Sequence, residues 1–474
     1  MPSISPGFRP PRPSPQPKAL GPIALLKALR RNPLECWTKA HFEEPIVLGG
    51  FPFGRVAVVS EPAAIRKVLV ENSHDYRKSA LERRILSPRL RNGLVAVDAE
   101  QWSVQRRTLA PLFTRKALSQ LAPAMVDAAA ALVARWRDRP QGSLLDVKTE
   151  MSALALDGLV RSIFHEGIAG DAQAMRTAMV TFFESAGHID PFDVIGLPDF
   201  IPRITRWRVR ALLRSFDAAL DATIAQRRRG FNARATAAAR DMLGIMLAAR
   251  DPETGRRLSE AEVKGNVLTF VFAGQETTST ALTWALYLLS QSPEWAARIT
   301  AESERAHAAR GEEPIAQLPE TRAVLDEAMR LYPPIVGITR TATKEGELAG
   351  CAIARGTMVV VAPYVLHRHA RLWDDPDRFD PGRFLDGNGR KIDRYSYLPF
   401  GVGPRMCIGA GFALQEATLV LAAIMRNFVL ALAPGQSVWP QQRLTLRPRG
   451  PLMMAVTPRG WHSIACVPTV PNGL

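Results

Sequence analysis

The sequence predicts a mainly α protein, one large helical domain with a small β-rich portion. Helical periodicity starts after Ser60 and continues through most of the chain, whereas short β-branched runs lie before Ser60 and in the final quarter. No internal repeat and no linker-like stretch divides the 474 residues, 47% of which are hydrophobic. We therefore expect a proline-rich, disordered arm over residues 1–20 and a single domain over residues 21–474.

Short strands are expected at four places. Each is rich in β-branched or other apolar residues, and a Gly/Pro turn separates the first two. The four segments are residues 45–48, 55–59, 358–362 and 452–456. Longer stretches rich in alanine or other apolar residues indicate helices at residues 126–136, 241–249 and 262–290.

Charge and cysteine content limit the partners that we expect. The net charge is +16, but the arginine cluster at residues 227–229 has no interleaved aromatics and no nucleic-acid-binding motif. We therefore expect a solvated helix face there and no nucleic acid. The cysteines form no Cys-x-x-Cys pair, which predicts neither a zinc site nor a disulfide framework and fits the cytoplasm. They are Cys36, Cys351, Cys407 and Cys466.

The first 30 residues contain no apolar run long enough to insert into a membrane. The best candidate, residues 22–26, is interrupted by Lys27 and is too short for a signal peptide or a bilayer span. The expectation is a soluble protein without a membrane span.

Residues 400–409, Phe-Gly-Val-Gly-Pro-Arg-Met-Cys-Ile-Gly, form the most informative stretch. Cys407 lies in a stiff loop just before an expected helix, where the helix dipole favours a thiolate. Gly409 lacks a Cβ and would let a flat ligand approach the backbone. A buried, inert cysteine is the commoner fate of a lone cysteine. However, the spacing Phe-x-x-Gly-x-Arg-x-Cys-x-Gly resembles the haem-binding loop of the cytochrome P450 monooxygenases at every defining position.

This resemblance implies that the protein binds haem b and that Cys407 is the axial ligand of its iron. Phe400 and Gly409 would then lie against the cofactor, with Phe400 and Ile408 shielding the sulfur from water. Thiolate ligation pushes electron density onto the iron and favours cleavage of dioxygen.

The expected helix at 262–290 contains Ala-Gly-Gln-Glu-Thr-Thr at residues 273–278. Gly274 costs about 1 kcal/mol relative to alanine inside a helix, and the Thr277 hydroxyl can bond back to the Ala273 carbonyl and loosen the helix. Small residues that permit close helix packing are the alternative explanation. The segment resembles the central-helix motif of the same family. That implies that Glu276 and Thr277 deliver protons to iron-bound dioxygen, with Ala273 and Gly274 beside it.

Three charged residues resemble the structural motifs of the family. Glu327 and Arg330 match its Glu-x-x-Arg helix, and Arg383, in Phe-Asp-Pro-Gly-Arg-Phe, matches its second arginine motif. The resemblance implies a buried charged network that fixes the cysteine loop, with a structural and not a catalytic role. Gly382 stands where an acidic residue is common in the family.

A further motif suggests how the acidic edge of haem is bound. Trp102 and Arg106 resemble the Trp-x-x-x-Arg helix of the family, and a spacing of four puts both on one helix face. With Arg405 and Arg340 they are candidates to bind the two haem propionates. A surface ion pair is the alternative for Arg106 and Arg340.

The resemblance therefore implies a monooxygenase that inserts one oxygen atom from O2 into an apolar substrate by hydroxylation or epoxidation. A peroxide-dependent peroxygenase of the same fold, or a non-catalytic haem sensor or electron carrier, is the alternative. In the family, several apolar segments line the substrate pocket but do not identify the substrate. They are the loop before Trp102, residues 182–200, the central helix, and the residues around 336–338 and 450–452.

The electron supply is expected to come from another protein. The sequence carries no flavin or iron–sulfur domain after the last expected strand. Between residues 101 and 126 there is no acidic residue, and Arg107, Arg115 and Lys116 have no predicted duty at the haem. We expect them to face solvent and to attract an acidic ferredoxin or flavodoxin.

Overall fold

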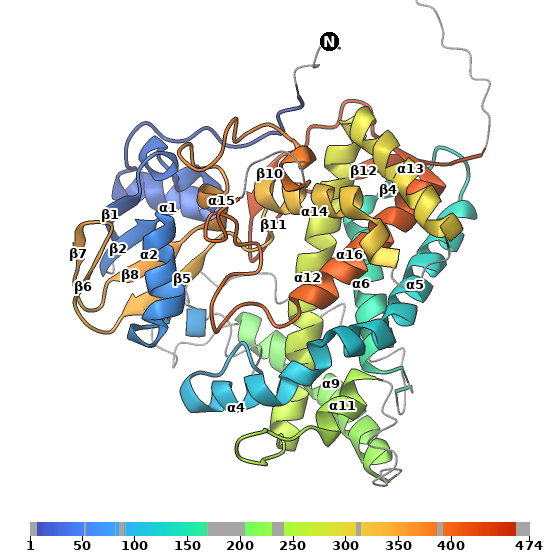
Figure 1. Cartoon of the computed structure of the whole chain (residues 1–474), viewed down its shortest axis with the longest axis horizontal. Helices are drawn as coiled ribbons and strands as arrows, with labels where there is room; N and C mark the ends of the chain where they lie inside the picture. Colours follow the sequence, from blue (N-terminus) through green and yellow to red (C-terminus); the bar gives the residue numbers. More distant parts are fainter. Residues whose placement is uncertain are drawn as a thin grey trace, which may run out of the picture.

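The computed structural model describes residues 7–51, 54–80, 82–84, 90, 92–165, 167–168, 204–229, 241–309, 314–385 and 392–460. The expected pocket segment at 182–200 and Cys466 lie outside these residues. A long helix, α12 (Glu260–Ser290), runs through the middle of the molecule (Figure 1). The other helices are α1 (Pro22–Arg31), α2 (Pro62–Arg66), α4 (Ala99–Leu109), α5 (Arg115–Arg137), α6 (Val147–Ile163), α9 (Ile204–Arg229), α11 (Met242–Ala248), α13 (Pro293–Ala309), α14 (Pro319–Leu331), α15 (Pro363–Leu366) and α16 (Ala410–Asn427).

The main sheet lies to one side of the helices and has the strand order β1-β2-β8-β5-β3 (Figure 1). Its strands pair antiparallel except for β2 and β8, which are parallel. A second sheet, β4-β12-β9, pairs the strand between α5 and α6 with two strands that follow α16, and β6-β7 and β10-β11 are antiparallel pairs. The strands are β1 (Ile46–Phe51), β2 (Gly54–Val59), β3 (Tyr76–Lys78), β4 (Leu144–Asp146), β5 (Ile338–Ala342), β6 (Gly346–Leu348), β7 (Cys351–Ile353), β8 (Met358–Val361), β9 (Phe428–Leu432), β10 (Pro440–Gln442), β11 (Leu446–Pro448) and β12 (Met453–Pro458).

These elements confirm the mainly α fold and place a strand or helix at each segment predicted from the sequence. The start of α12 is fixed by a capping box: the Ser259 hydroxyl accepts from the Glu262 N–H, and the Glu262 carboxylate accepts from the Ser259 N–H. Two apolar clusters bury the ends of α12. Val263 to Phe272 contribute to one cluster and Leu282 to Leu289 to another, which leaves residues 273–280 between them.

The N-terminal arm differs from the expectation of disorder in its described part, residues 7–20. Pro10 and Pro13 are buried, and Arg12 pairs with Asp377 at 2.5 Å. The Tyr332 hydroxyl donates to the Pro11 carbonyl at 2.7 Å. Proline keeps this segment extended at little entropic cost, so a few contacts are enough to hold it against the helical part.

Among the described helices, α5 has the length and apolar composition of a membrane span. Its buried face, which includes Leu121, Met125 and Leu132, contributes to both apolar clusters that flank α12. A helix inside a globular protein meets the same criteria.

Candidate active site

The loop that carries Cys407 is shaped by tight turns. The Cys407 N–H donates to the Phe400 carbonyl at 2.9 Å, and the Met406 N–H donates to the Gly403 carbonyl at 3.0 Å. Gly403 has φ +79°, and a Cβ there would lie 2.1 Å from the Leu69 carbonyl oxygen. Only glycine satisfies both the left-handed backbone and this close approach. The loop ends at Gly409, the N-cap of α16.

The Cys407 side chain is exposed, yet burial among protein atoms raises the pKa of its thiol. Both observations hold if the sulfur faces an open hollow inside the molecule. The Gly409 N–H and the Arg106 charge oppose this rise in pKa. Because burial outweighs them, the helix N-terminus alone does not stabilise the thiolate, contrary to the sequence-based argument. A metal ion bound to the sulfur would supply the missing positive charge.

One aromatic ring links the cysteine loop to α12. The Phe113 ring packs edge-on against Phe270, with 5.4 Å between ring centroids, and its edge lies 3.7 Å from where a Gly409 Cβ would be. Phe113 was missed in the sequence because it belongs to no motif. Its contacts bring the end of the cysteine loop close to the central helix.

On α12, Ala273 is exposed although the residues just before it are buried. The Thr277 hydroxyl donates to the Ala273 carbonyl at 2.6 Å, which confirms the predicted back-bond. Gly274 faces α6, where a Cβ would come 2.9 Å from Leu159 Cδ1. The alternative explanation therefore holds for Gly274, which permits close helix packing. The open position on this helix is at Ala273.

A cationic cluster lies at the edge of the same region. Arg405 stacks over the Trp102 ring, 4.3 Å from its centroid, and pairs with Asp98, while its buried Nη1 has no partner in the described structure. Burial lowers the pKa of Arg106 and of Arg340. Arg340 keeps one ion pair, with Glu82 at 3.5 Å.

Lys78 belongs to this cluster and was missed in the sequence. It pairs with Arg340 across β3 and β5, and its Nζ donates to the carbonyls of Val95 and Val97. Burial lowers the pKa of Lys78 to about 8, opposed by Glu82 and assisted by Arg405. Its role could not be predicted from the sequence, because only the pairing of two distant strands brings Lys78 beside Arg340. The cluster therefore holds four cations beside the two carboxylates of Glu82 and Asp98, and this excess of positive charge suits a dianionic ligand.

The three predicted structural residues come together. Arg330 donates to both Glu327 oxygens, at 2.6 and 2.8 Å, and both side chains are fully buried. Arg383 Nε lies 3.6 Å from Glu327 Oε1. Arg330 also donates to the His367 carbonyl, and His367 Nε2 accepts from the Leu398 N–H at 2.8 Å. Through His367 the network thereby reaches Leu398, two residues before the cysteine loop begins at Phe400.

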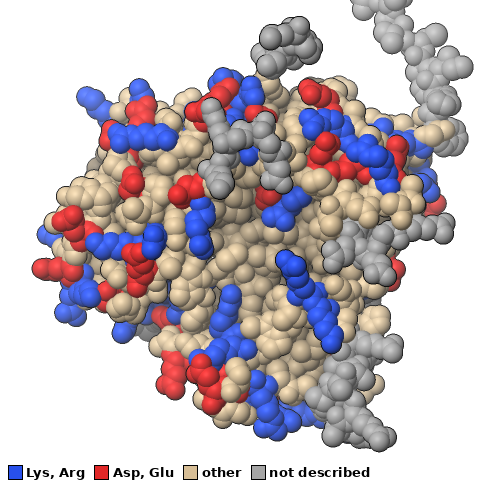
Figure 2. Space-filling view, viewed as in Figure 1, with Lys and Arg blue, Asp and Glu red and all other residues tan. Residues whose placement is uncertain are grey.

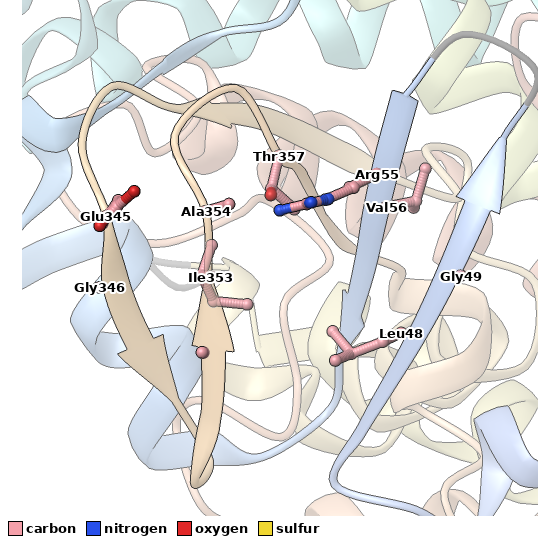
Figure 3. A pocket seen from close by; sticks show the side chains of 10 residues that line it. Leu48, Gly49, Arg55, Val56, Glu345, Gly346, Ile353, Ala354 and Thr357 are labelled. Atoms are coloured by element: carbon pink, nitrogen blue, oxygen red, sulfur yellow. The ribbon is translucent and has the colours of Figure 1, made fainter.

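A separate pocket of about 360 Å³ lies on the sheet side of the molecule, between the β1–β2 strands and the β6–β7 hairpin (Figure 3). Its polar lining residues are Arg55, Glu345 and Thr357, and Leu48 and Ile353 form apolar walls. None of its lining residues comes from the cysteine loop or from α12, so it is distinct from the site described above.

A family model described as Cytochrome P450 matches residues 11–456. The chain belongs to the cytochrome P450 family. A cyclooctat-9-en-7-ol 5-monooxygenase from Streptomyces melanosporofaciens is 30% identical over 93% of this chain and 95% of that protein. A pentalenene oxygenase from Streptomyces avermitilis is 32% identical over 78% of this chain and 80% of that protein. The crystal structure of the cytochrome P450DA heme domain superposes with a TM-score of 0.81, 27% identity and coverage of 94% and 97%.

This P450 is accordingly a haem-thiolate monooxygenase with haem b as its cofactor, and it uses O2, a substrate and a redox partner. The residues present fit the cofactor. Cys407 is exposed, the buried Arg405 Nη1 has no partner among the described residues, and Ala273 interrupts the buried surface of α12.

Proposed function

We propose that Cys407 is the thiolate ligand of the haem iron, with Phe400 and Gly409 beside the cofactor. The observation that carries this assignment is that Cys407 is exposed although protein atoms around its thiol raise the pKa of that group, with the Arg106 charge close enough to oppose the rise. Arg106, Arg340, Arg405 and Lys78 would bind the propionates, and Trp102 would hold Arg405 in place through its ring. Glu327, Arg330 and Arg383 would fix the loop without touching the cofactor.

When bound, haem b supplies the iron at which dioxygen is reduced and its O–O bond is split. The residues of α12 manage protons. Thr277 holds its proton on the Ala273 carbonyl, next to the open position of the helix, and turning about χ1 would present that proton to the site. Glu276 would replace the proton that Thr277 gives up. Ala273 leaves room there, whereas Gly274 packs against α6.

The experiment is replacement of Cys407 by serine. Cys407→Ser should abolish the red-shifted carbon monoxide spectrum of thiolate-ligated ferrous haem, because a hydroxyl is a poor donor to iron. Cys36→Ser and Cys351→Ser are the matched controls, since both side chains are half-buried and lie outside the loop. Retention of the spectrum in Cys407→Ser, with its loss in a control, would overturn the assignment.

We further propose a lipophilic substrate. The relatives named above act, by their names, on pentalenene and on cyclooctat-9-en-7-ol. In this chain, Phe270 and Phe272, on the turn of α12 before Ala273, belong to an apolar cluster that adjoins this open position. A screen of lipophilic compounds for a spin-state change in the absorption spectrum tests this proposal, and a response limited to charged, polar compounds would contradict it.

We propose that the electron donor is an acidic ferredoxin or flavodoxin, which docks beside the cysteine loop. Arg115 and Lys116 are exposed at the start of α5, and the next turn, at Leu118, contacts α16 through Gly411 and Gln415. Met406 is also exposed. Arg107 is not available as we expected, because it pairs with the buried Asp251 at 2.8 Å and with Glu253 at 3.2 Å.

We also propose that the protein is cytoplasmic and that it binds no nucleic acid. Arg227 pairs with Asp241 at 2.9 Å and Arg228 with Glu260 at 3.4 Å, which supports a structural role for that cluster. On the face shown in Figure 2, basic and acidic side chains are interspersed, so the net charge of +16 is not collected into one patch there.

A further inference from the structure

The two residues of the proposed proton pair bond to different partners. Glu276 Oε1 accepts from the Thr445 hydroxyl at 2.7 Å and lies 3.8 Å from Arg447 Nη1. The Thr277 hydroxyl donates along its own helix to Ala273. Glu276 is thus directed towards the segment that leads into β11, whereas Thr277 is directed along α12.

Thr445 is rigidly placed. It is 1% exposed, and the next residue, Leu446, is bonded on both sides. The Leu446 N–H donates to the Pro334 carbonyl at 3.1 Å, and its carbonyl accepts from the Trp284 indole at 2.7 Å. Trp284 lies further along α12 and is stacked on Tyr332, with 3.7 Å between ring centroids. The Thr445 hydroxyl is therefore fixed relative to the helix that carries Glu276.

Arg447 extends this contact to solvent. The Arg447 side chain is 33% exposed and that of Glu276 is 26% exposed. Lys148, in the first turn of α6, belongs to the same charged group. Burial lowers the pKa of Lys148, the nearby Asp146 and Glu276 raise it, and Arg447 lowers it. The Glu276 carboxylate therefore lies at a solvent edge between one fixed hydroxyl and the Arg447 guanidinium, and the Lys148 amine nearby donates to the Gly450 carbonyl at 2.7 Å.

We propose that Thr445 and Arg447 are positioning residues that hold the Glu276 carboxylate at this edge until it takes up a proton. The inference rests on the proposed roles of Glu276 and Thr277. A hydronium ion gives a proton to the carboxylate and leaves as water. The resulting neutral acid loses its attraction to Arg447 and keeps only a neutral hydrogen bond with Thr445, about half as strong as a charge-assisted one. The acid then turns, gives its proton to the Thr277 oxygen as Thr277 passes on its own, and returns as a carboxylate.

The test uses the haem-loaded enzyme with a substrate found in the lipophilic screen. Thr445→Val keeps the shape but removes the donor, and Arg447→Gln removes the charge. Each should lower product formed per reducing equivalent about threefold and raise peroxide release, because proton supply becomes slower. Arg447→Lys should recover most of this loss. Arg443→Gln, an exposed arginine just before Thr445 in the sequence, is the matched control and should leave the yield unchanged.

A second readout does not depend on activity. Thermal unfolding of the haem-loaded protein is measured for Glu276→Met, which keeps the length of the side chain but removes the carboxylate that accepts from Thr445, for Thr445→Val and for the double variant. Each single change should lower the midpoint by about 2 °C, the size expected for one hydrogen bond to a charged group. The double variant should fall no further than the larger single effect, because both changes remove the same bond.

The outcomes separate the two proposals. An unchanged product yield in Glu276→Gln would refute the proposed role of Glu276 itself. A reduced yield in Glu276→Gln, with Thr445→Val and Arg447→Gln equal to Arg443→Gln, would leave that role intact and overturn the positioning inference. Strict additivity in the unfolding midpoints would also overturn it. The carbon monoxide spectrum identifies any variant that has lost its haem. If Thr445→Val or Arg447→Gln has lost it, the product yields of Arg447→Lys and Arg443→Gln are compared: similar yields, both close to that of the parent, support the inference, and a low yield in Arg447→Lys contradicts it.

Discussion

The two sides of the proposed site are built in different ways. The cysteine side gathers residues that are far apart in the sequence, and buried charges hold them: Lys78 of β3, Arg106 of α4, Arg340 of β5 and the network of Glu327, Arg330 and Arg383. The oxygen side comes from consecutive small and polar residues of α12, which lie between two apolar clusters. The first side requires most of the fold to be in place, whereas the second lies mainly on one helix. Changes on the first side should therefore lower stability and cofactor binding strongly, and changes on the second should act mainly on the chemistry.

The largest effect is expected from Arg330→Ala. This change leaves the Glu327 carboxylate fully buried without its bidentate partner, which costs about 3–5 kcal/mol. Haem content after expression and the free energy of unfolding in urea should both fall. Arg371→Ala removes an ion pair with Glu44 in which both side chains are more than half exposed, and should cost less than about 1 kcal/mol. If Arg330→Ala and Arg371→Ala lowered haem content and the free energy of unfolding equally, the buried network would not be what holds the cysteine side together.

Glu416, on α16 behind the cysteine loop, should make stability fall as pH rises. Burial raises the pKa of Glu416 to about 8 from its ordinary 4.5, and both carboxyl oxygens are buried without a partner in the described structure. The carboxyl fits against Gly158 of α6, where a Cβ would lie 2.1 Å from Oε1. Between pH 4.5 and 8 the unfolded chain loses this proton while the folded protein keeps it, so folding becomes less favourable across that window.

Glu416→Gln provides the measurement, because the amide stays neutral at every pH. We expect the variant to match the parent near pH 4.5 and to exceed it by about 4 kcal/mol near pH 8, in denaturant unfolding at both pH values. The nearest charges on α6, Asp157 and Arg161, pair with each other at 2.7 Å. A difference that does not change with pH would show that the Glu416 carboxyl is ionised in the folded protein.

The same contrast explains what could be predicted from the sequence. The α12 site follows from local chemistry: Thr277 bonds to the carbonyl four residues earlier, and one helix contains both groups. The cysteine loop was found only through its motif. Lys78, Phe113 and Thr445 were missed because their roles depend on strand pairing or on ring and hydroxyl contacts between distant segments. The expectation for Arg107 was wrong for the same reason, since its partner Asp251 lies far along the chain.

Thr277→Ala tests the oxygen side. Haem content and the unfolding midpoint should stay close to those of the parent, whereas product per reducing equivalent should fall about tenfold and peroxide release should rise. General acid–base groups contribute about 10²–10⁴-fold, and water can replace part of that here. Thr283→Ala is the matched control, because its hydroxyl makes the same bond to the carbonyl of Ser279, at 2.6 Å, inside the apolar cluster. If Thr283→Ala uncouples the enzyme equally, a general loosening of α12 is responsible, and not proton delivery.

The smallest effect is expected at the surface beside the cysteine loop. Arg115→Glu and Lys116→Glu reverse exposed charges at the start of α5, so reduction by an acidic ferredoxin or flavodoxin should slow a few-fold without any change in substrate binding. Exposed charges are screened over about 8 Å at physiological ionic strength, and the difference from the parent should therefore shrink as salt is added. Arg305→Glu, at an exposed position on α13, controls for the change in net charge. Arg107→Glu would be misleading, because it breaks the pair with buried Asp251 and would lower stability as well. Equal reduction rates for Arg115→Glu, Lys116→Glu and Arg305→Glu would mean that the donor docks elsewhere, and the cysteine side would then be separated from its source of electrons.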